Sequence, residues 1–280
     1  MKKTNIYIIA EIGVNHNGSI AKAKKLIVQA KKCGANAIKF QHFNPDEMIL
    51  SDTKKANYQI SNKNNLNQYE MLQKLKLSDS EFIELNKFSR KNNIDFLCTP
   101  FDLLGFNFLK NTLKVSSVKI SSTDLTNLPL LIAIGKSRMN VVVSSGMSEI
   151  EDVDTALSAL AFGYMNIKGK FSLKRHSNLY KKYHKYLLNK IILMHCTSSY
   201  PAPMDELNLN VIDLYRERYN IRIGYSDHSH SQLTPIIAAS KNIVAIEVHV
   251  TLSNKLSGPD HKSSLNMNQF SKYVNNIRLT

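Results

Sequence analysis

The residues of this sequence best suited to chemistry are two histidines, His228 and His249, each near the end of a short apolar run. Neutral imidazole binds borderline divalent metals such as Mn, Fe, Co or Zn. Two imidazoles on one ion leave coordination positions for water or substrate, which suits a Lewis acid. Either histidine could instead be a satisfied core or surface group, but two at the ends of consecutive runs favour a shared metal site.

Two carboxylates accompany the histidines. Glu247 lies two residues before His249, so the period-two alternation of a β-strand would place both side chains on one face. Glu11 ends the first apolar run of the chain. A buried carboxylate beside a metal could act as a base or position a water molecule. The alternative for each acid is a structural ion pair with an interior lysine.

Two lysines, Lys39 and Lys119, lie within apolar runs, where lysine is rarely buried without a partner. They indicate either a bound anion or pairing with the two carboxylates. Lysines, small hydroxyls and backbone N–H groups together could form a phosphate cradle, although each hydroxyl could instead cap the helix that follows it. Hydroxyl residues near the ends of these runs include Thr99, Ser122, Ser144, Ser198 and Ser226.

The apolar runs predict the elements that position these side chains. Each run reads as a strand and is followed by a helical segment, and a strand–helix unit of about 30 residues suits a βαβ repeat. Eight such units predict a (β/α)8 TIM barrel, whose active site lies at the C-terminal ends of the strands. The expected strands are 6–12, 37–41, 95–98, 117–120, 140–144, 191–195, 221–225 and 243–250. The expected helices are 20–33, 78–91, 103–110, 128–135, 148–162, 209–218, 232–240 and 268–278.

A doubly wound open sheet is the weaker alternative. The strand count is eight, and no glycine-rich dinucleotide fingerprint follows the first strand. A long polar loop is expected over 44–68, and loops of this length are usually functional lids or disordered segments.

Length and composition agree with one barrel domain over residues 1–280, since such barrels need about 250 residues. Hydrophobic residues make up 43%, and no apolar run approaches the roughly 20 residues of a membrane span. With no signal peptide recognised and three scattered cysteines, we expect a reducing cytoplasm and no disulfide framework. Cys196 directly follows His195, but neighbours on a strand point to opposite faces, so a Cys/His nucleophile pair is not expected.

The net charge of +15 is concentrated in one segment. Residues 163–190 hold eight Lys or Arg and no acid, which predicts a solvated basic insertion before the sixth strand. Interleaved tyrosines keep a contact with a polyanion or a membrane surface open. Surface lysines can also steer an anionic substrate, so a nucleic-acid partner is not expected.

Nine motifs in order give the chain a resemblance to the sialic acid synthase family, which comprises N-acetylneuraminate synthase and its legionaminic and pseudaminic acid relatives. The resemblance covers nearly the whole chain. It is carried by IAEIGVNHNG (9–18), KFQ (39–41), CTPF (98–101), KISS (119–122), SSGM (144–147), HCTSSYP (195–201), GYSDH (224–228), EVH (247–249) and GPDH (258–261).

The resemblance implies a synthase that condenses phosphoenolpyruvate with the open-chain aldehyde of an N-acetylated amino sugar, giving a nonulosonic acid and phosphate. It implies His228 and His249 as ligands of a divalent metal, commonly Mn²⁺, with Mg²⁺ or Co²⁺ as alternatives. Glu11 would contact the sugar and Glu247 would manage the attacking water, with Lys119 as a third catalytic residue. The expected substrate-binding residues are Lys39, Gln41, Thr99, Ser122, Ser144, Ser198, Tyr200, Ser226 and Asp227.

Some family features have no counterpart in this chain. The family's C-terminal antifreeze-like domain is expected to be absent, and Val248 replaces a cationic residue. We expect a homodimer and, as a further partner, a separately encoded C-terminal domain. Asn64, Asn65 and Asn67 are candidates for the sugar-binding asparagine. Two alternatives to an active synthase are an impaired barrel that only binds sugar or phosphoenolpyruvate, and a metal-dependent sugar-phosphate aldolase or isomerase.

Overall fold

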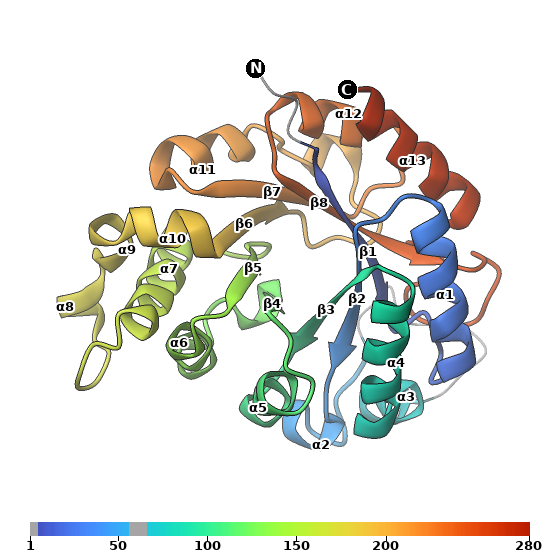
Figure 1. Ribbon diagram of the computed structural model, residues 1–280, viewed down its shortest axis with the longest axis horizontal. Helices are drawn as coiled ribbons and strands as arrows, with labels where there is room; N and C mark the ends of the chain where they lie inside the picture. The colour runs from blue at the N-terminus through green and yellow to red at the C-terminus, as the bar shows by residue number, and fades with distance from the viewer. Residues whose placement is uncertain (1–4, 56–65) are drawn as a thin grey trace.

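The computed structural model describes residues 5–55 and 66–280. Eight parallel strands in the order β3-β2-β1-β8-β7-β6-β5-β4 form the centre of the molecule (Figure 1). β4 and β3, at the two ends of this order, contact each other without a hydrogen-bonded ladder among the described residues. The predicted TIM barrel is therefore confirmed as a nearly closed ring. Its strands are β1 (Tyr7–Gly13), β2 (Ala37–His42), β3 (Asp95–Pro100), β4 (Ser117–Ile120), β5 (Asn140–Ser144), β6 (Ile191–Cys196), β7 (Arg222–Asp227) and β8 (Ala245–Thr251).

Helices surround this ring, and local capping sets where several of them begin. Ser78 and Glu81 form a capping box at the start of α4, and Asn67 and Glu70 form one at the start of α3. The helices are α1 (Ile20–Lys32), α2 (Pro45–Met48), α3 (Gln68–Leu75), α4 (Asp79–Lys91), α5 (Leu103–Asn111), α6 (Leu128–Ser137), α7 (Ile150–Tyr164), α8 (Leu173–His176), α9 (Leu179–Lys182), α10 (His184–Lys190), α11 (Val211–Tyr219), α12 (Thr234–Ser240) and α13 (Met267–Leu279). The remaining elements are the 3-10 turns η2 (Ser122–Asp124) and η3 (Met204–Glu206), and the two-residue strand β9 (Leu265–Asn266) beside β8.

Alternation along the strands divides the apolar residues into two separate clusters. One alternating set faces the helices and belongs to the large core, as Ile8, Ala10 and Ile12 of β1 do. The other set faces the barrel axis, where Ile9, Ala37, Leu97, Val142, Met194 and Ala245 form a compact cluster of their own. This cluster forms a middle layer inside the ring. The inward positions beyond it, toward the C-terminal ends, are polar.

The predicted basic insertion forms the short helices α8, α9 and α10, and part of it is packed. Tyr180 and Leu187 are buried in the main core and anchor α9 and α10 against the barrel. Its basic side chains except Lys190 are exposed. The described helices include none that is long and apolar enough to cross a membrane.

Helices α6 and α7 cross so closely that glycine is required at the contact. A Cβ on Gly163 would lie 2.5 Å from the Ile132 carbonyl oxygen and 2.9 Å from Gly135 Cα. We therefore expect Gly163→Ala to lower the free energy of unfolding by about 1–3 kcal/mol through overpacking. Urea denaturation checks this, with the exposed Glu151→Ala on the same helix as the control. Equal stability of the two variants would contradict the proposed contact.

Candidate active site

A cavity of about 500 Å³ opens at the C-terminal ends of the strands. It lies above the middle layer and is lined by polar side chains from all eight strands or the loops that follow them. The catalytic, substrate-binding and metal-binding residues predicted from the sequence all line it, with the exception of Asp227. The lining includes Glu11, Lys39, Gln41, Thr99, Lys119, Ser122, Ser144, Ser198, Tyr200, Ser226, His228, Glu247 and His249.

Asp227, which we expected to bind substrate, does not line the cavity. Ser226 and His228 line the cavity, and Asp227 between them points to the opposite side of the strand. Its carboxylate accepts hydrogen bonds from Ser229 and, at 2.8 Å, from the Tyr273 hydroxyl. Asp227 therefore ties β7 to α13 instead of contacting the cavity.

The structure describes one of the three asparagine candidates of the 44–68 loop, Asn67. Asn64 and Asn65 lie outside the described residues. Asn67 caps α3: its side chain accepts a hydrogen bond from the Glu70 backbone N–H and donates one to the Ser51 carbonyl. It does not line the cavity.

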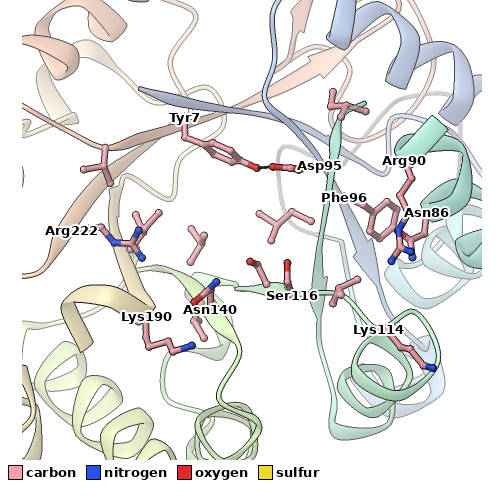
Figure 2. Close-up of a pocket in the computed structure, with 18 of the residues that line it drawn as sticks. Tyr7, Asn86, Arg90, Asp95, Phe96, Lys114, Ser116, Asn140, Lys190 and Arg222 are labelled. Atoms are coloured by element: carbon pink, nitrogen blue, oxygen red, sulfur yellow. Dashed lines mark hydrogen bonds between the residues drawn. The ribbon is translucent and has the colours of Figure 1, made fainter. Parts of the chain in front are cut away.

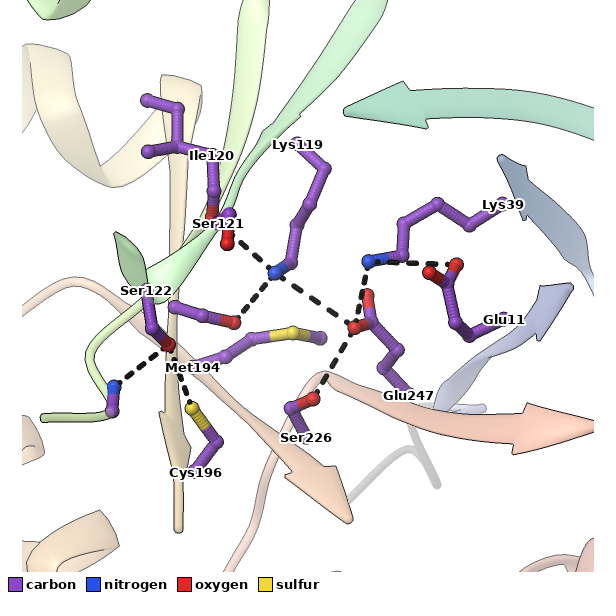
Figure 3. Close-up of polar contacts among 12 residues, drawn as sticks. Glu11, Lys39, Lys119, Ile120, Ser121, Ser122, Met194, Cys196, Ser226 and Glu247 are labelled. Carbon is purple, nitrogen blue, oxygen red and sulfur yellow. Dashed lines mark hydrogen bonds and ion pairs between the residues drawn. The ribbon is translucent and has the colours of Figure 1, made fainter. Parts of the chain in front are cut away.

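A buried network of two lysines and two carboxylates forms the cavity floor (Figure 3). Lys39 Nζ lies 2.9 Å from Glu247 Oε1 and 3.5 Å from Glu11 Oε2. Lys119 Nζ lies 3.8 Å from Glu247 Oε1 and donates a 2.5 Å hydrogen bond to Ser144 Oγ. All four charged groups are at most 5% exposed. Glu11 and Glu247 are therefore the buried partners that the sequence required for the two lysines.

The network gives its two carboxylates different proton affinities. Burial raises the pKa of Glu11 to about 7, and Lys39 only partly opposes this effect. Burial also acts to raise the pKa of Glu247, but Lys119 and Lys39 together outweigh it and hold that pKa at about 2. Glu11 can therefore exchange a proton near neutral pH, whereas Glu247 stays ionised. Gln41 donates a 2.8 Å hydrogen bond to Glu11 Oε1 and fixes its orientation.

The two lysines also differ. Burial acts to lower the pKa of Lys39, but Glu11 and Glu247 overcome it and raise that pKa. For Lys119 burial dominates and lowers the pKa to about 8. Lys119 is therefore charged below pH 8 and neutral above it, and its attraction for an anion is lost as the pH rises.

We expect kcat/KM for an anionic substrate to fall with a slope approaching tenfold per pH unit above about pH 8, because Lys119 loses its charge there. The pH profile of Lys119→Arg tests the assignment, since guanidinium stays protonated across this range. The alkaline fall should disappear from that profile whatever the absolute activity. An unchanged fall in Lys119→Arg would assign it to another group.

Small hydrogen-bonding groups surround one side of the floor. Ser122 Oγ accepts a 3.0 Å hydrogen bond from the Gly146 N–H and lies 3.2 Å from Cys196 Sγ. A Cβ on Gly146 would collide with Ser198 Oγ, Ser122 Oγ and Cys196 Sγ, so the backbone approaches them only because this residue is glycine. Thr99 Oγ1 is buried and has no hydrogen-bond partner among the described residues. These groups could donate to a bound oxyanion beside the lysines.

Cys196 is a cavity residue that sequence reasoning did not select. Its neighbour His195 does not line the cavity, and His195 Nε2 bonds to the Leu207 carbonyl at 2.8 Å. The alternation of β6 places Met194 and Cys196 on the axis side and His195 on the other. The same alternation, read from the sequence, could have identified Cys196 as an inward-facing residue at the end of β6.

The two histidines converge at the cavity wall. Their ring centroids lie 5.8 Å apart, and the Tyr200 ring packs at a tilt against His228 with centroids 4.2 Å apart. His228 Nδ1 lies 2.6 Å from the Thr197 carbonyl, so Nδ1 carries the proton and Nε2 is left as an acceptor. Nδ1 of His249 is buried without a hydrogen-bond partner among the described residues.

Both rings are neutral at physiological pH. Burial lowers the pKa of His228 to about 4 and that of His249 to about 3. Across residues 5–55 and 66–280, no group of three or more His, Cys, Asp or Glu side chains is arranged to hold a metal ion. A metal bound at this pair would therefore need water or substrate as further ligands.

The outer wall of the cavity is apolar. It consists of Val14, Met48, Ile49, Met71, Leu72 and Phe101. Val14 and Leu72 belong to a small hydrophobic cluster that joins α3 to the first βα loop. The cavity is therefore charged at its floor and apolar toward its mouth.

The barrel and this cavity define an enzyme class: a TIM-barrel enzyme whose cavity brings buried lysines and carboxylates close to a pair of neutral imidazoles. A model of the NeuB family matches residues 26–280, and the chain belongs to this family. The resemblance predicted from the motifs is thereby confirmed.

Named relatives agree with this assignment. The chain is 38% identical to the N,N'-diacetyllegionaminic acid synthase of Campylobacter jejuni, over 99% of this chain and 76% of the relative. It is 34% identical to the synthase of the same name from Legionella pneumophila, over 97% of this chain and 71% of the relative. The N-acetylneuraminic acid synthetase of Leptospira borgpetersenii, solved with citrate, has a TM-score of 0.79 at 31% identity, covering 98% of this chain and 83% of that one.

Proposed function

We propose that this protein condenses phosphoenolpyruvate with the open-chain aldehyde of an N-acetylated amino sugar, forming a nonulosonic acid and phosphate. One observation carries the proposal: a single cavity in a NeuB-family barrel joins an anion cradle to a neutral imidazole pair. Relatives named as synthases of N,N'-diacetyllegionaminic acid support it. The reaction needs both halves, because an enol carbon must meet an activated aldehyde at close range.

In this proposal the floor residues bind phosphoenolpyruvate. Lys119 and Lys39 attract its phosphate and carboxylate, and Ser122 and Thr99 donate hydrogen bonds to them. The enol carbon forms a bond to the aldehyde carbon, and the aldehyde oxygen takes up a proton that Glu11 can supply near neutral pH. Water, oriented by the ionised Glu247, then adds to the former enol carbon and gives a proton to the Glu11 carboxylate, which is free after the first step. The bond between this carbon and the phosphate oxygen breaks, the new hydroxyl becomes the keto oxygen, and its proton leaves with the phosphate.

His228 and His249 would hold a divalent cation, with Mn²⁺ as first choice and Mg²⁺ or Co²⁺ as alternatives. The donor set fits, because both rings are neutral and a buried ring nitrogen of His249 has no hydrogen-bond partner among the described residues. The Thr197 carbonyl orients His228 as outer hydrogen-bond partners of metal-binding imidazoles do. When bound, the cation would polarise the sugar aldehyde.

The apolar wall favours an uncharged sugar. Among the described residues that line the cavity, the lysines and arginines are Lys39 and Lys119 alone. Both already contact the carboxylates of the floor. Met48, Ile49 and Met71 offer contact to methyl groups such as those of acetamido substituents. We propose N-acetylmannosamine or a 2,4-diacetamido sugar ahead of a sugar phosphate.

The test is phosphate release from phosphoenolpyruvate with each of these three sugars, in Mn²⁺ and after chelation. We expect release with at least one uncharged acetamido sugar, strong dependence on the metal, and little release with the sugar phosphate. Release with the sugar phosphate alone would overturn the proposed sugar class. No release with any member, from protein that binds phosphoenolpyruvate, would favour a binding protein over a synthase.

The assembly and location predicted from the sequence stay predictions. They comprise a homodimer, a separately encoded C-terminal domain and a cytoplasmic location. Light scattering of the purified chain measures the first of these directly.

A further inference from the structure

A second cavity, of about 750 Å³, opens at the opposite end of the barrel (Figure 2). It lies at the N-terminal ends of the strands, next to the gap between β3 and β4. Leu97 and Val142 of the middle layer line its inner side. Since that layer separates it from the floor network, the second cavity is distinct from the candidate active site.

The charged lining of this cavity is mostly cationic. Arg90, Lys114, Lys190 and Arg222 line it against one carboxylate, Asp95. That carboxylate accepts a hydrogen bond from the Tyr7 hydroxyl. None of the four cations forms an ion pair within the described part of the chain. An excess of positive charge inside a concave site focuses the field on a small anion.

Arg222 is the best-placed of these groups. It is half-buried, and its Nε is buried with no hydrogen-bond partner among residues 5–55 and 66–280. A buried guanidinium N–H without an acceptor is rare in folded proteins and calls for one. Arg222 Nη2 contacts only the Asn189 carbonyl, at 3.3 Å. The remaining donors of its planar fork suit a phosphate or carboxylate.

Lys190 and Asn140 lie on the same side of the cavity as Arg222 (Figure 2). Lys190 Nζ donates a 2.9 Å hydrogen bond to the Arg138 carbonyl, which holds its ammonium at the rim and leaves two N–H groups. Asn140 and Ser117 begin the neighbouring strands β5 and β4 and add uncharged hydrogen-bonding groups. Charged and neutral donors therefore gather beside an apolar inner wall.

We propose that this cavity is a binding site for a small-molecule oxyanion, of the phosphate or carboxylate class, held mainly by Arg222 and Lys190. Its volume falls within the usual range for small-molecule sites, roughly 300–1,000 Å³. The apolar side chains of the inner wall would contact the body of the ligand. The proposal does not depend on the reaction assigned to the other end of the barrel.

Calorimetric titration of the full chain with pyrophosphate, citrate and uridine 5'-monophosphate tests the site. The same titrations of Lys119→Met identify binding in the active-site cavity, because binding there should weaken in this variant. We expect at least one probe to show a binding event that survives Lys119→Met and weakens at least about tenfold in Arg222→Gln. Tighter binding of the nucleotide than of pyrophosphate would assign a role to the apolar wall, and the reverse would assign recognition to the oxyanion alone.

Two controls keep the result interpretable. Lys181→Gln removes the same charge from the exposed face of α9, and affinity should stay within about twofold. If Arg222→Gln does not fold by circular dichroism, Lys190→Gln at the cavity rim replaces it. The proposal is overturned if no probe binds outside the active-site cavity, or if Lys181→Gln weakens binding as much as the cavity variants do.

Discussion

Replacing either His228 or His249 by alanine should lower kcat for phosphate release by about 10²–10³-fold, because each change removes half of the imidazole pair. Binding of Mn²⁺, followed by electron paramagnetic resonance, should weaken in the same variants. The pair is buried in the cavity wall, so unfolding midpoints must be recorded for both variants.

His184→Ala is the matched control for this experiment. His184 lies in α10, away from the cavity, and its ring contacts the Lys181 carbonyl. Activity and Mn²⁺ affinity should be unchanged in this variant. If both His228→Ala and His249→Ala kept full activity, the metal assignment would have to be abandoned.

Lys39→Met should lower the free energy of unfolding by about 3–5 kcal/mol and also abolish detectable turnover. The substitution keeps the length of the side chain but removes the cation that lies 2.9 Å from Glu247 and 3.5 Å from Glu11. Both carboxylates would then share Lys119 alone in a buried site. Urea denaturation measures the stability, and phosphate release measures the turnover.

The control is an ion pair of the same residue types on the surface. Lys24 pairs with Glu84, and their side chains are 30% and 56% exposed. Lys24→Met should cost no more than about 1 kcal/mol, since exposed pairs contribute little. Adding Glu247→Gln to Lys39→Met should recover part of the lost stability, because it removes one of the unpaired charges. Equal costs for the two lysine variants would show that the floor network is not electrostatically coupled.

The barrel and most of the cavity lining could be predicted because both depend on short-range pattern. Apolar runs located the eight strands to within a few residues, and a polar residue at an inward position near a strand's C-terminal end points to the cavity. Lys39 and Lys119 were informative for the same reason, since a lysine within an apolar run must find a buried partner. Their partners, Glu11 and Glu247, come from strands next to each other in the ring.

Residues outside this pattern were harder to place. Asp227 comes two residues after the expected strand 221–225 and looked like a cavity residue. The alternation of the strand instead points its side chain toward Tyr273 on α13, and no local motif encodes this contact across the fold. Helix α3 was missed because it lies within an expected loop and depends on its Asn67 cap. The second cavity was missed because its cations come from four separate segments. None of those residues forms a motif with another.

The gap between β3 and β4 has a mechanical consequence. In a ring where every neighbouring pair shares a ladder, each join is held by backbone hydrogen bonds. This ring is a rolled sheet whose two edges lie side by side without a ladder among the described residues. Backbone amides along those edges lack the interstrand protection that β1 receives from both β2 and β8. Thermal fluctuations should therefore part the cylinder lengthwise at this join before any other strand pair separates.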